Sequence, residues 1–209
     1  MYSQRKMSNN FEMIGLFPVP LFKIKFKDHY KYNFPEVEKM DRKPDGWIES
    51  LNSSFPNIPD NDSIVPSYLR DNLKRDLKSS IVEVFQPLNI PTNIEFLQLW
   101  YNIYHDNQGQ EKHTHFSYVG RPVPFWSGIY YNKKASPTKF FSTNNMRETL
   151  QFKGWKESEI APCLAEYCAL PVEDGDIILF PPYLPHGVES IPAHEDKMRM
   201  TFSFNITLI

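Results

Sequence analysis

Three of the chain's six histidines have a spacing suited to metal binding. Residues 111–120 read EKHTHFSYVG and put His113 and His115 two positions apart. If residues 112–116 are extended, side-chain alternation sends both imidazoles to the same face, where they could share one ion. An HxH pair alone is a weak signal, because a surface strand can carry two histidines without any function. A metal site therefore needs a third ligand.

His186 is the candidate for that third ligand. It ends the run VEDGDIILFPPYLPHGV at residues 172–188, in which a Gly-Asp turn precedes a short apolar strand and a proline-rich turn. Such a turn would hold the imidazole rigidly at the end of a strand, as a metal ligand requires. From this run alone, His186 could equally be a histidine in a turn with no ligand role.

The end of the chain could supply a binding group of another kind. Residues 199–206, RMTFSFNI, alternate between an apolar face and a polar face that carries Arg199 and Thr201. The polar face could meet water, as is usual for such strands. Alternatively it lines a cavity, in which the planar guanidinium of Arg199 would bind a carboxylate beside the Thr201 hydroxyl.

Residues 95–104 show the same alternation. Trp100, Asn102 and Tyr104 share one face of this expected strand, which leads directly toward the HTH segment. Two polar and aromatic faces flanking three histidines indicate a lined pocket.

The elements expected to hold these residues in place are mostly strands. After Pro91 the chain alternates aromatic and β-branched runs with turns, which is typical of an all-β region. The expected strands are residues 95–104, 125–132, 139–141, 176–180 and 198–209.

The first part of the chain is expected to support this β region. Residues 68–85 carry apolar side chains at spacings of three and four, which predicts a helix. Residues 20–26 alternate and begin with Pro20, which predicts an edge strand. Residues 27–66 are polar and rich in proline, so we expect loops and short helical turns there.

Composition limits the classes of protein. A chain of 209 residues that is 41% apolar and 15% aromatic suits a packed globular protein. A net charge of −2 disfavours a nucleic-acid partner held by phosphate contacts. The apolar run at residues 13–22 is short and interrupted by Pro18 and Pro20, so it is neither a signal peptide nor a membrane span. We therefore expect a cytoplasmic protein without a membrane partner, and a homodimer is compatible with the sequence.

Four blocks of the chain resemble the iron(II)- and 2-oxoglutarate-dependent oxygenases. In order they are LWYNIYHDN, EKHTHF followed by WSGIYYNKK, VEDGDIILFPPYLPHGV, and RMTFSFNI. Four blocks in the right order are far more specific than any one of them. They are most similar to the short oxygenases of this superfamily that are common in bacteria and their phages. The N-terminal GLFPVPLF is also similar to that family's opening strand.

The resemblance implies a mainly β fold, a double-stranded β-helix, which is a cupin-like jelly roll with N-terminal helical elements packed on it. We expect one domain over residues 1–209, with a loose tail at 1–10. An N-terminal strand and helical support would occupy residues 11–92. The jelly-roll core would follow at residues 93–209, with an insertion at about 142–166.

The resemblance also implies roles for individual residues. His113 and His186 match the family's two ligand histidines. His115 stands where many relatives carry Asp or Glu, although the short oxygenases commonly have His there; this departure leaves the identity of the third ligand open. Arg199 matches the residue that binds the distal carboxylate of 2-oxoglutarate, and Thr201 matches the hydroxyl of the family's RxS pattern.

Further residues are expected around this centre. Tyr104 and Asn102 are candidate helpers at the cosubstrate, while Phe116, Arg121 and Trp126 are candidates to contact the substrate. No catalytic residue is expected beyond the metal site. The substrate itself, a small molecule or a peptide, is not indicated by the sequence.

The implied activity uses Fe(II), 2-oxoglutarate and O2, releases succinate and CO2, and usually hydroxylates a C–H bond. Two other hypotheses stay open. A three-histidine cupin-type metalloenzyme would not use 2-oxoglutarate, and a non-catalytic jelly-roll binding module would not need iron. Arg199 with Thr201 favours the 2-oxoglutarate enzyme.

Overall fold

Most of the described chain forms strands. The computed structural model describes residues 5–8, 11–16, 19–39, 51–55, 67–105, 107–115, 123–134, 136–143, 166–190 and 198–209. The strands of the larger sheet are β1 (Arg5–Ser8), β2 (Phe11–Leu16), β3 (Val19–Lys25), β4 (Asn52–Ser53), β5 (Ile94–Tyr104), β7 (Trp126–Lys133), β10 (Asp176–Phe180) and β12 (Arg199–Leu208). The strands of the smaller sheet are β6 (Gln110–His113), β8 (Lys139–Phe141), β9 (Tyr167–Ala169) and β11 (His186–Val188).

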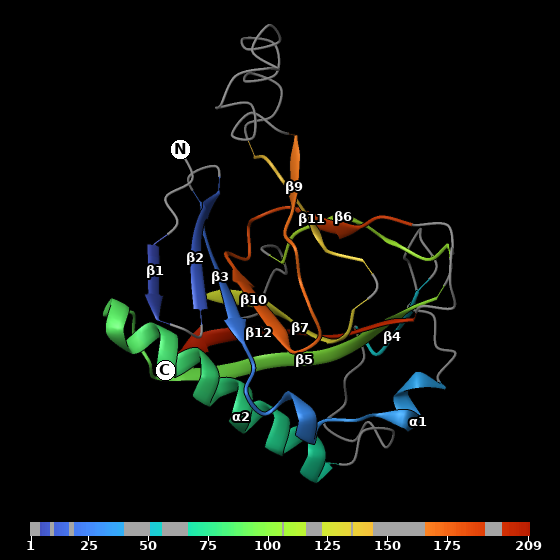
Figure 1. Cartoon of the computed structure of the whole chain (residues 1–209), viewed down its shortest axis with the longest axis horizontal. Coiled ribbons are helices and arrows are strands. Elements are labelled where there is room, and N and C mark those ends of the chain that lie inside the picture. Colours follow the sequence, from blue (N-terminus) through green and yellow to red (C-terminus); the bar gives the residue numbers. More distant parts are fainter. Residues whose placement is uncertain are drawn as a thin grey trace, which may run out of the picture.

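The two sheets and one long helix form three layers. The larger sheet has the strand order β1-β2-β3-β10-β7-β12-β5-β4 and the smaller sheet the order β6-β11-β8-β9. All strand pairs within the described residues are antiparallel. Helix α2 (Ser67–Phe85) lies on one side of the larger sheet and the smaller sheet on the other (Figure 1). This is the jelly roll that we expected.

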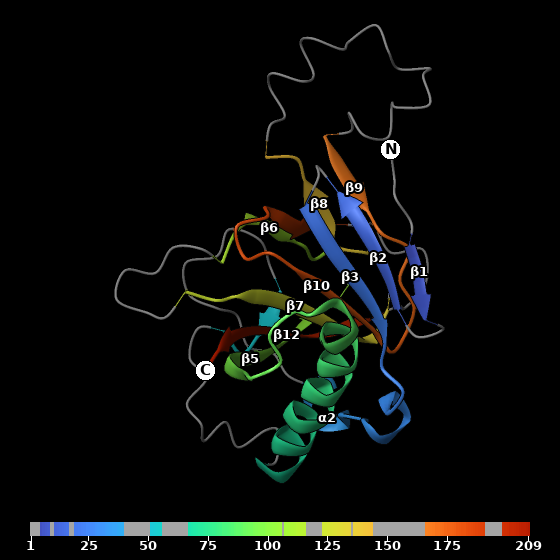
Figure 2. The same ribbon diagram turned by 90° about the vertical axis from the view of Figure 1, so that its left-hand side faces the viewer.

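Helix α2 covers the larger sheet because its apolar side chains recur at helical spacing. Leu73, Leu77, Ile81 and Val84 are at most 2% exposed and belong to one core cluster with the apolar face of β12. The β12 members of this cluster are Met200, Phe202, Phe204 and Ile206. Each such side chain stabilises the fold by about 1.5–3 kcal/mol. The turned view shows α2 running beneath the sheet (Figure 2).

The opposite face of β12 and its neighbour β5 points into the space between the sheets. The register pairs Arg199 with Tyr104, Thr201 with Asn102, Ser203 with Trp100 and Asn205 with Gln98. Arg199 and Thr201 are each 1% exposed. The polar face of the last strand therefore lines the interior and does not meet water. We call these four pairs the polar ladder.

A second apolar core fills the rest of this inner space. It combines side chains of β7 and β10 with residues on and near the smaller sheet. Its members include Ile129, Tyr131, Ile178, Phe180, Phe140 and Leu184. The polar ladder therefore stands beside a dry region, where electrostatic interactions are stronger than in water.

The expected helix and the five expected strands after Pro91 are confirmed. The proline-rich turn after β10 leads into the short strand β11. The segment 27–66 carries the short helices η1 (His29–Lys31) and α1 (Pro35–Glu38) and the strand β4 in its described parts. A further short helix, η2 (Gln86–Leu88), follows α2. Residues 144–165 of the expected insertion lie outside the described residues.

Two expectations for the N-terminal region differ from the structure. Arg5–Ser8 forms a strand within the segment expected to be a loose tail, and it pairs with β2. The expectation that β3 is an edge strand is wrong, because β3 pairs with β2 on one side and β10 on the other. Pro20 is tolerated there because the pairing with β10 begins only at Phe22.

No helix within the described residues has both the length and the apolar character of a membrane span.

Candidate metal centre

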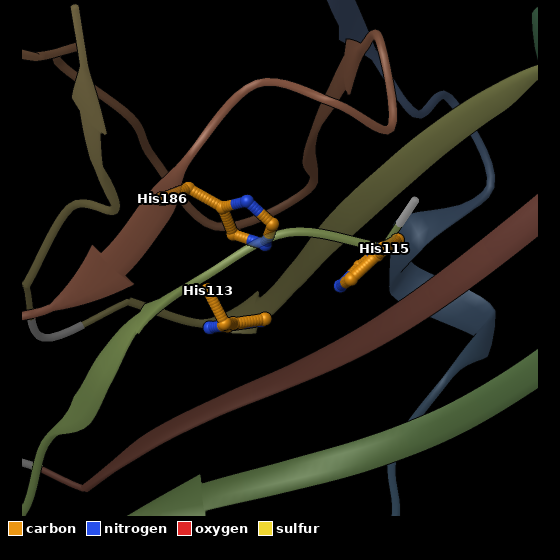
Figure 3. A group of neighbouring side chains, drawn as sticks. All are labelled: His113, His115 and His186. Carbon is orange, nitrogen blue, oxygen red and sulfur yellow. The ribbon is translucent and has the colours of Figure 1, made fainter. Parts of the chain in front are cut away.

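The three candidate histidines meet where β6 and β11 pair. His113 ends β6 and faces His186, the first residue of β11, across the antiparallel ladder. His115 follows two residues after His113, and its backbone N–H donates to Pro182 O at 2.9 Å. One ligand atom from each imidazole lies within 4.8 Å of the other two. Figure 3 shows the three rings gathered around a common space. The HxH spacing and the proline-rich turn thus bring together three residues from two segments.

The Nδ1 nitrogen of each histidine is held by the protein. Nδ1 of His113 donates to Glu111 O at 2.8 Å, and Nδ1 of His186 donates to Leu184 O at 3.0 Å. Nδ1 of His115 lies 2.9 Å from Asn205 Oδ1. Carbonyl and amide oxygens can only accept, so each Nδ1 carries the proton. Each Nε2 therefore presents a lone pair, which is what a metal ligand needs.

Burial keeps these imidazoles neutral. It lowers the pKa of His113 below its ordinary value, and it lowers the pKa of His115 to about 3 with help from the nearby His113. The pKa of the fully enclosed His186 also lies well below its ordinary value, through burial and the other two rings. At neutral pH all three rings are therefore neutral, with one proton each at Nδ1, so no proton competes with an ion for the Nε2 lone pairs.

The amide of Asn205 holds His115 as part of a longer chain of contacts. Ser127 Oγ donates to Asn205 Oδ1 at 2.7 Å and lies 2.8 Å from His115 Nδ1. Asn205 Nδ2 in turn donates to Gln98 Oε1 at 3.0 Å. This second contact fixes which end of the amide faces His115. The polar ladder therefore orients one of the three histidines.

A β-bulge brings β6 close to β11. The register shifts between His186 and Val188, so Gly187 faces the extra residues of β6. A Cβ on Gly187 would sit 2.9 Å from Gln110 O and 3.3 Å from the backbone of Glu111. Gly187 allows the two strands to approach, and the bulge turns both Gln110 and Glu111 toward the histidines.

Arg199 lies buried at the other end of the polar ladder. Its guanidinium lies 4.8 Å from the ring of Tyr104 and 5.2 Å from the ring of Tyr131, and Nη2 donates to Thr138 Oγ1 at 2.9 Å. Nε and Nη1 are buried and have no partner among the described residues. A buried cation with unpaired donors is costly. A carboxylate at one edge of the guanidinium would bind one of these donors together with the second N–H of Nη2, as a bidentate partner does.

Gln110 links Arg199's neighbourhood to the histidines. Tyr104 donates its hydroxyl to Gln110 Oε1 at 2.8 Å, and Gln110 Nε2 lies 3.4 Å from Nε2 of His113. The expected helper Tyr104 thus contacts both the guanidinium and the residue beside the metal ligands. A diacid that reached from the histidines to Arg199 would pass along this side of the ladder.

The other two expected cosubstrate residues are buried in the same ladder. Thr201 pairs with Asn102 on one side and Tyr131 on the other. Asn102 donates to Ser203 Oγ at 3.0 Å and accepts from Ser53 Oγ at 2.6 Å. The side chain of Asn102 therefore joins β4, β5 and β12, and a contact of Asn102 with a cosubstrate stays a prediction.

A pocket of about 110 Å³ opens beside the histidines. It is lined by Phe55, Gln98, Trp100, Gln110, Glu111, His113, Thr114, His115 and Asn205. Arg199 and the side chains around it are not part of this lining. The pocket therefore offers a space next to the proposed ion that is separate from the surroundings of the arginine.

Of the three expected substrate residues, one lies within the described part of the chain. Phe116 and Arg121 lie outside the described residues. Trp126 is described, and the structure does not place it at the site. Its ring packs against Phe22 at 5.2 Å and Phe85 at 6.0 Å, in the core beneath α2. As the first residue of β7, Trp126 points to the helix side of the sheet, so the substrate role expected for it is not supported.

Several site residues were not singled out from the sequence. Asn205 lies on the same alternating face as Arg199, and that pattern could have identified it. Gln110 and Glu111 carry no such signal, because a bulge in β6 decides where they point. Thr138 belongs to the loop before β8, and its contact with Arg199 depends on the packing of the two sheets.

Two facing antiparallel sheets that enclose three convergent imidazoles and a buried arginine define a jelly-roll protein with a metal-binding centre. The model of the family described as "Putative 2OG-Fe(II) oxygenase" matches residues 98–205. The chain belongs to this family. The match includes the three histidines, Arg199 and the whole pocket except Phe55. Among curated proteins, no match is found.

Solved structures show the same fold. The structure of HygX from Streptomyces hygroscopicus with nickel, 2-oxoglutarate and hygromycin B is 15% identical, has a TM-score of 0.57, and covers 91% of this chain and 83% of HygX. HygX with nickel and 2-oxoglutarate gives a TM-score of 0.53 at the same identity and coverage. A prolyl-4-hydroxylase from Pseudomonas putida is 11% identical, with a TM-score of 0.49 and coverages of 80% and 77%. The two HygX structures support the jelly-roll assignment.

Proposed function

We propose that the protein is an Fe(II)- and 2-oxoglutarate-dependent dioxygenase that hydroxylates a substrate. The observation that carries the proposal is the pairing of three neutral, convergent imidazoles with a buried arginine that has two unpartnered N–H donors. The nickel and 2-oxoglutarate in the HygX structures support it, because that protein shares the fold. When bound, iron(II) and 2-oxoglutarate supply the oxidising chemistry, with O2 consumed and succinate and CO2 released.

The histidines would hold the ion through their Nε2 atoms. His113, His115 and His186 are fixed by hydrogen bonds at Nδ1, so little side-chain freedom is lost on metal binding. Three protein ligands leave part of an octahedral coordination sphere for other groups. His115 replaces the carboxylate of the more familiar triad, so the protein would contribute three neutral ligands.

Arg199 would bind the distal carboxylate of 2-oxoglutarate. Tyr104 and Tyr131 lie close to the guanidinium, and Thr138 accepts a hydrogen bond from Nη2, so the guanidinium plane and its unpaired donors Nε and Nη1 are held in fixed directions. Thr201 belongs to the next pair of the polar ladder, two residues after Arg199 on β12, and would offer a hydroxyl beside the same carboxylate. The apolar side chains of the inner core keep water away from this ion pair, which strengthens it.

The first experiment measures cosubstrate turnover and metal binding together. The purified chain, freed of metal, is supplied with Fe(II), 2-oxoglutarate and O2, and succinate formation is measured alone and with pools of candidate small molecules and peptides. We expect metal-dependent succinate formation, which His186→Ala abolishes together with metal binding. Metal binding without any 2-oxoglutarate turnover would favour the three-histidine cupin enzyme, and no metal binding would favour a binding module.

The variant Arg199→Ala tests the cosubstrate site. We expect the 2-oxoglutarate concentration needed for half-maximal turnover to rise by at least about 100-fold, because a charge-assisted bidentate pair is lost, while the metal stays bound. Titration calorimetry with the metal and succinate assays over a 2-oxoglutarate series measure the two effects. Arg75→Ala, on the exposed side of α2, is the matched control. Unchanged turnover in Arg199→Ala would contradict the role of Arg199.

A further inference from the structure

The pocket beside the histidines carries a carboxylate that no basic side chain of its described lining pairs. Of its lining side chains, Glu111 is the one carboxylate, and neither lysine nor arginine is among the described residues that line it. Glu111 Oε2 is shielded from solvent and has no hydrogen-bond partner among the described residues. A shielded carboxylate oxygen without a partner is costly, and a bound donor would relieve that cost.

The lysines that could be considered as partners of Glu111 have other contacts. Lys139 forms an ion pair with Glu189, and Lys25 forms one with Glu173. Lys112, adjacent to Glu111 in sequence, lies 4.7 Å above the ring of Phe141. None of these three lysines is a hydrogen-bond partner of Glu111 Oε2.

Aromatic rings form another wall of the same pocket. The rings of Phe55 and Trp100 lie 5.2 Å apart at 50°, and Trp100 lies 5.5 Å from the ring of His115. The face of an indole attracts a cation more strongly than any other side-chain ring. A carboxylate and an indole thus border one space, and both favour a positive charge.

The pocket has room for a small bound group. Its volume is about 110 Å³. A short alkyl arm ending in an ammonium group fits this space. Phe55 and Trp100 supply the apolar surface that such an arm would cover.

We propose that this pocket binds a positively charged amine, carried on a short apolar arm of the substrate. Glu111 would be the counter-charge of the amine, and the indole ring of Trp100 would contact it. The inference rests on the proposed function and deepens it, since two of the three histidines drawn in Figure 3, His113 and His115, line the same pocket. The arm would therefore lie beside the metal. Glu111 would then be a specificity-determining residue, selecting amines over neutral or acidic analogues.

The test compares a cationic probe with a neutral one of the same shape. The full-length protein is loaded with zinc(II), which has no redox activity, and titrated with n-butylammonium or 1-butanol while ligand NMR signals are followed. We expect n-butylammonium to bind at least tenfold more tightly, equivalent to about 1.4 kcal/mol. In Glu111→Gln the difference should fall to about twofold or less, because the amide keeps the shape and removes the charge.

The control variant is Glu189→Gln, the same substitution at the Lys139-paired glutamate outside the pocket, and it should keep the tenfold preference. Equal affinities of the two probes, no binding of n-butylammonium, or an unchanged preference in Glu111→Gln would overturn the proposal. If Glu111→Gln does not fold, the ratio of the two probe affinities on the unaltered chain still tests the proposal, because equal affinities would contradict it. Zinc-loaded protein performs no oxidation, so this result is independent of succinate formation, whose absence would refute the dioxygenase alone.

Discussion

At the scale of single residues, the site depends on which nitrogen of each histidine the protein occupies. Two of the three Nδ1 atoms are held by backbone carbonyls two residues before the histidine, at Glu111 and Leu184. The third, in His115, is held by the side chain of Asn205 on a different strand. A local contact forms wherever the backbone has this conformation, whereas the Asn205 contact requires the polar ladder to be in place. His115 is therefore the ligand whose orientation a single side-chain change can alter.

Asn205→Ala is expected to weaken metal binding about 10- to 100-fold, because it removes the acceptor that fixes the proton on His115 Nδ1. Asn205→Asp keeps an acceptor oxygen and should restore most of the affinity. Titration of the metal-free protein with nickel(II) measures both. Ser203→Ala, on the same face but bonded to Asn102, is the matched control. Full affinity in Asn205→Ala would show that Ser127 alone positions His115.

Residue types and spacing identified the three histidines and Arg199 as candidates, and the resemblance to the oxygenase family gave them roles. The side chains that hold them were harder to recognise. Asn205 and Thr138 are ordinary polar residues, and their importance arises from contacts with His115 and Arg199 across the fold. Glu111 precedes the HxH pair as an unremarkable charged residue, and only the structure shows that its Oε2 is shielded without a partner among the described residues, next to the β6 bulge.

At the scale of elements, the approach of β6 to β11 sets the spacing of the ligands. His113 and His186 are partners across these two strands, so any change in their separation changes the distance between two imidazoles. The strands are short, and Gly187 is the point of closest approach. A side chain at that point would force the backbones apart, because the nearest atoms belong to the β6 backbone and cannot rotate away.

Gly187→Ala should therefore lower metal affinity at least tenfold and reduce the free energy of unfolding by about 1–3 kcal/mol. Its control is Gly175→Ala, in the turn before β10, where φ is +83° and a Cβ would meet His29 at 3.0 Å. That change should also destabilise the fold, through backbone strain, but leave the metal affinity of the folded protein unchanged. Urea unfolding and metal titration separate the two effects. Equal loss of metal affinity in both variants would contradict a local role for Gly187.

Elements with strong periodicity were predictable, and those that depend on pairing were not. Helix α2 and strand β12 carry apolar side chains at regular spacing, and both were recognised. Trp126 illustrates the limit, since a shift of one residue in a strand moves a side chain to the other face. Here Trp126 pairs with Ile206 and faces the helix. The role of β3 as an inner strand depends on β2, which is only six residues long (Phe11–Leu16) and was not recognised as a separate strand in the sequence.

At the scale of the whole molecule, α2 supports the larger sheet from the side opposite the metal centre. Besides the apolar core, two polar contacts join the helix to the segment that follows β3. Tyr32 donates its hydroxyl to Asp76 at 2.8 Å, and Lys27 pairs with Glu83 at 2.8 Å. Tyr32 also stacks on Phe34, which packs against Phe202 of β12. The Tyr32–Asp76 contact therefore connects the helix to the strand whose other face carries Arg199.

This connection makes stability depend on pH. Burial alone would raise the pKa of the Asp76 carboxyl, but hydrogen bonds from Tyr32 and Arg75 outweigh it, and the pKa lies below its ordinary value. Since the folded state holds the carboxyl ionised to lower pH than the unfolded state, the resulting stabilisation is complete above the unfolded pKa, about 3.9. It is lost as the pH falls through the lower pKa of the folded protein.

Asp76→Ala should accordingly lower the free energy of unfolding by about 1.5–3 kcal/mol at pH 7, because a hydrogen bond to a charged acceptor is lost. Below about pH 3 the difference from the unaltered chain should shrink, since protonation removes the same charge. Urea unfolding at pH 7 and below about pH 3 measures the difference in free energy of unfolding, with Asp71→Ala on the exposed side of α2 as the control. A difference that stayed constant from pH 7 into acid would show that Asp76 acts through packing, and that the contact between helix and sheet does not depend on its charge.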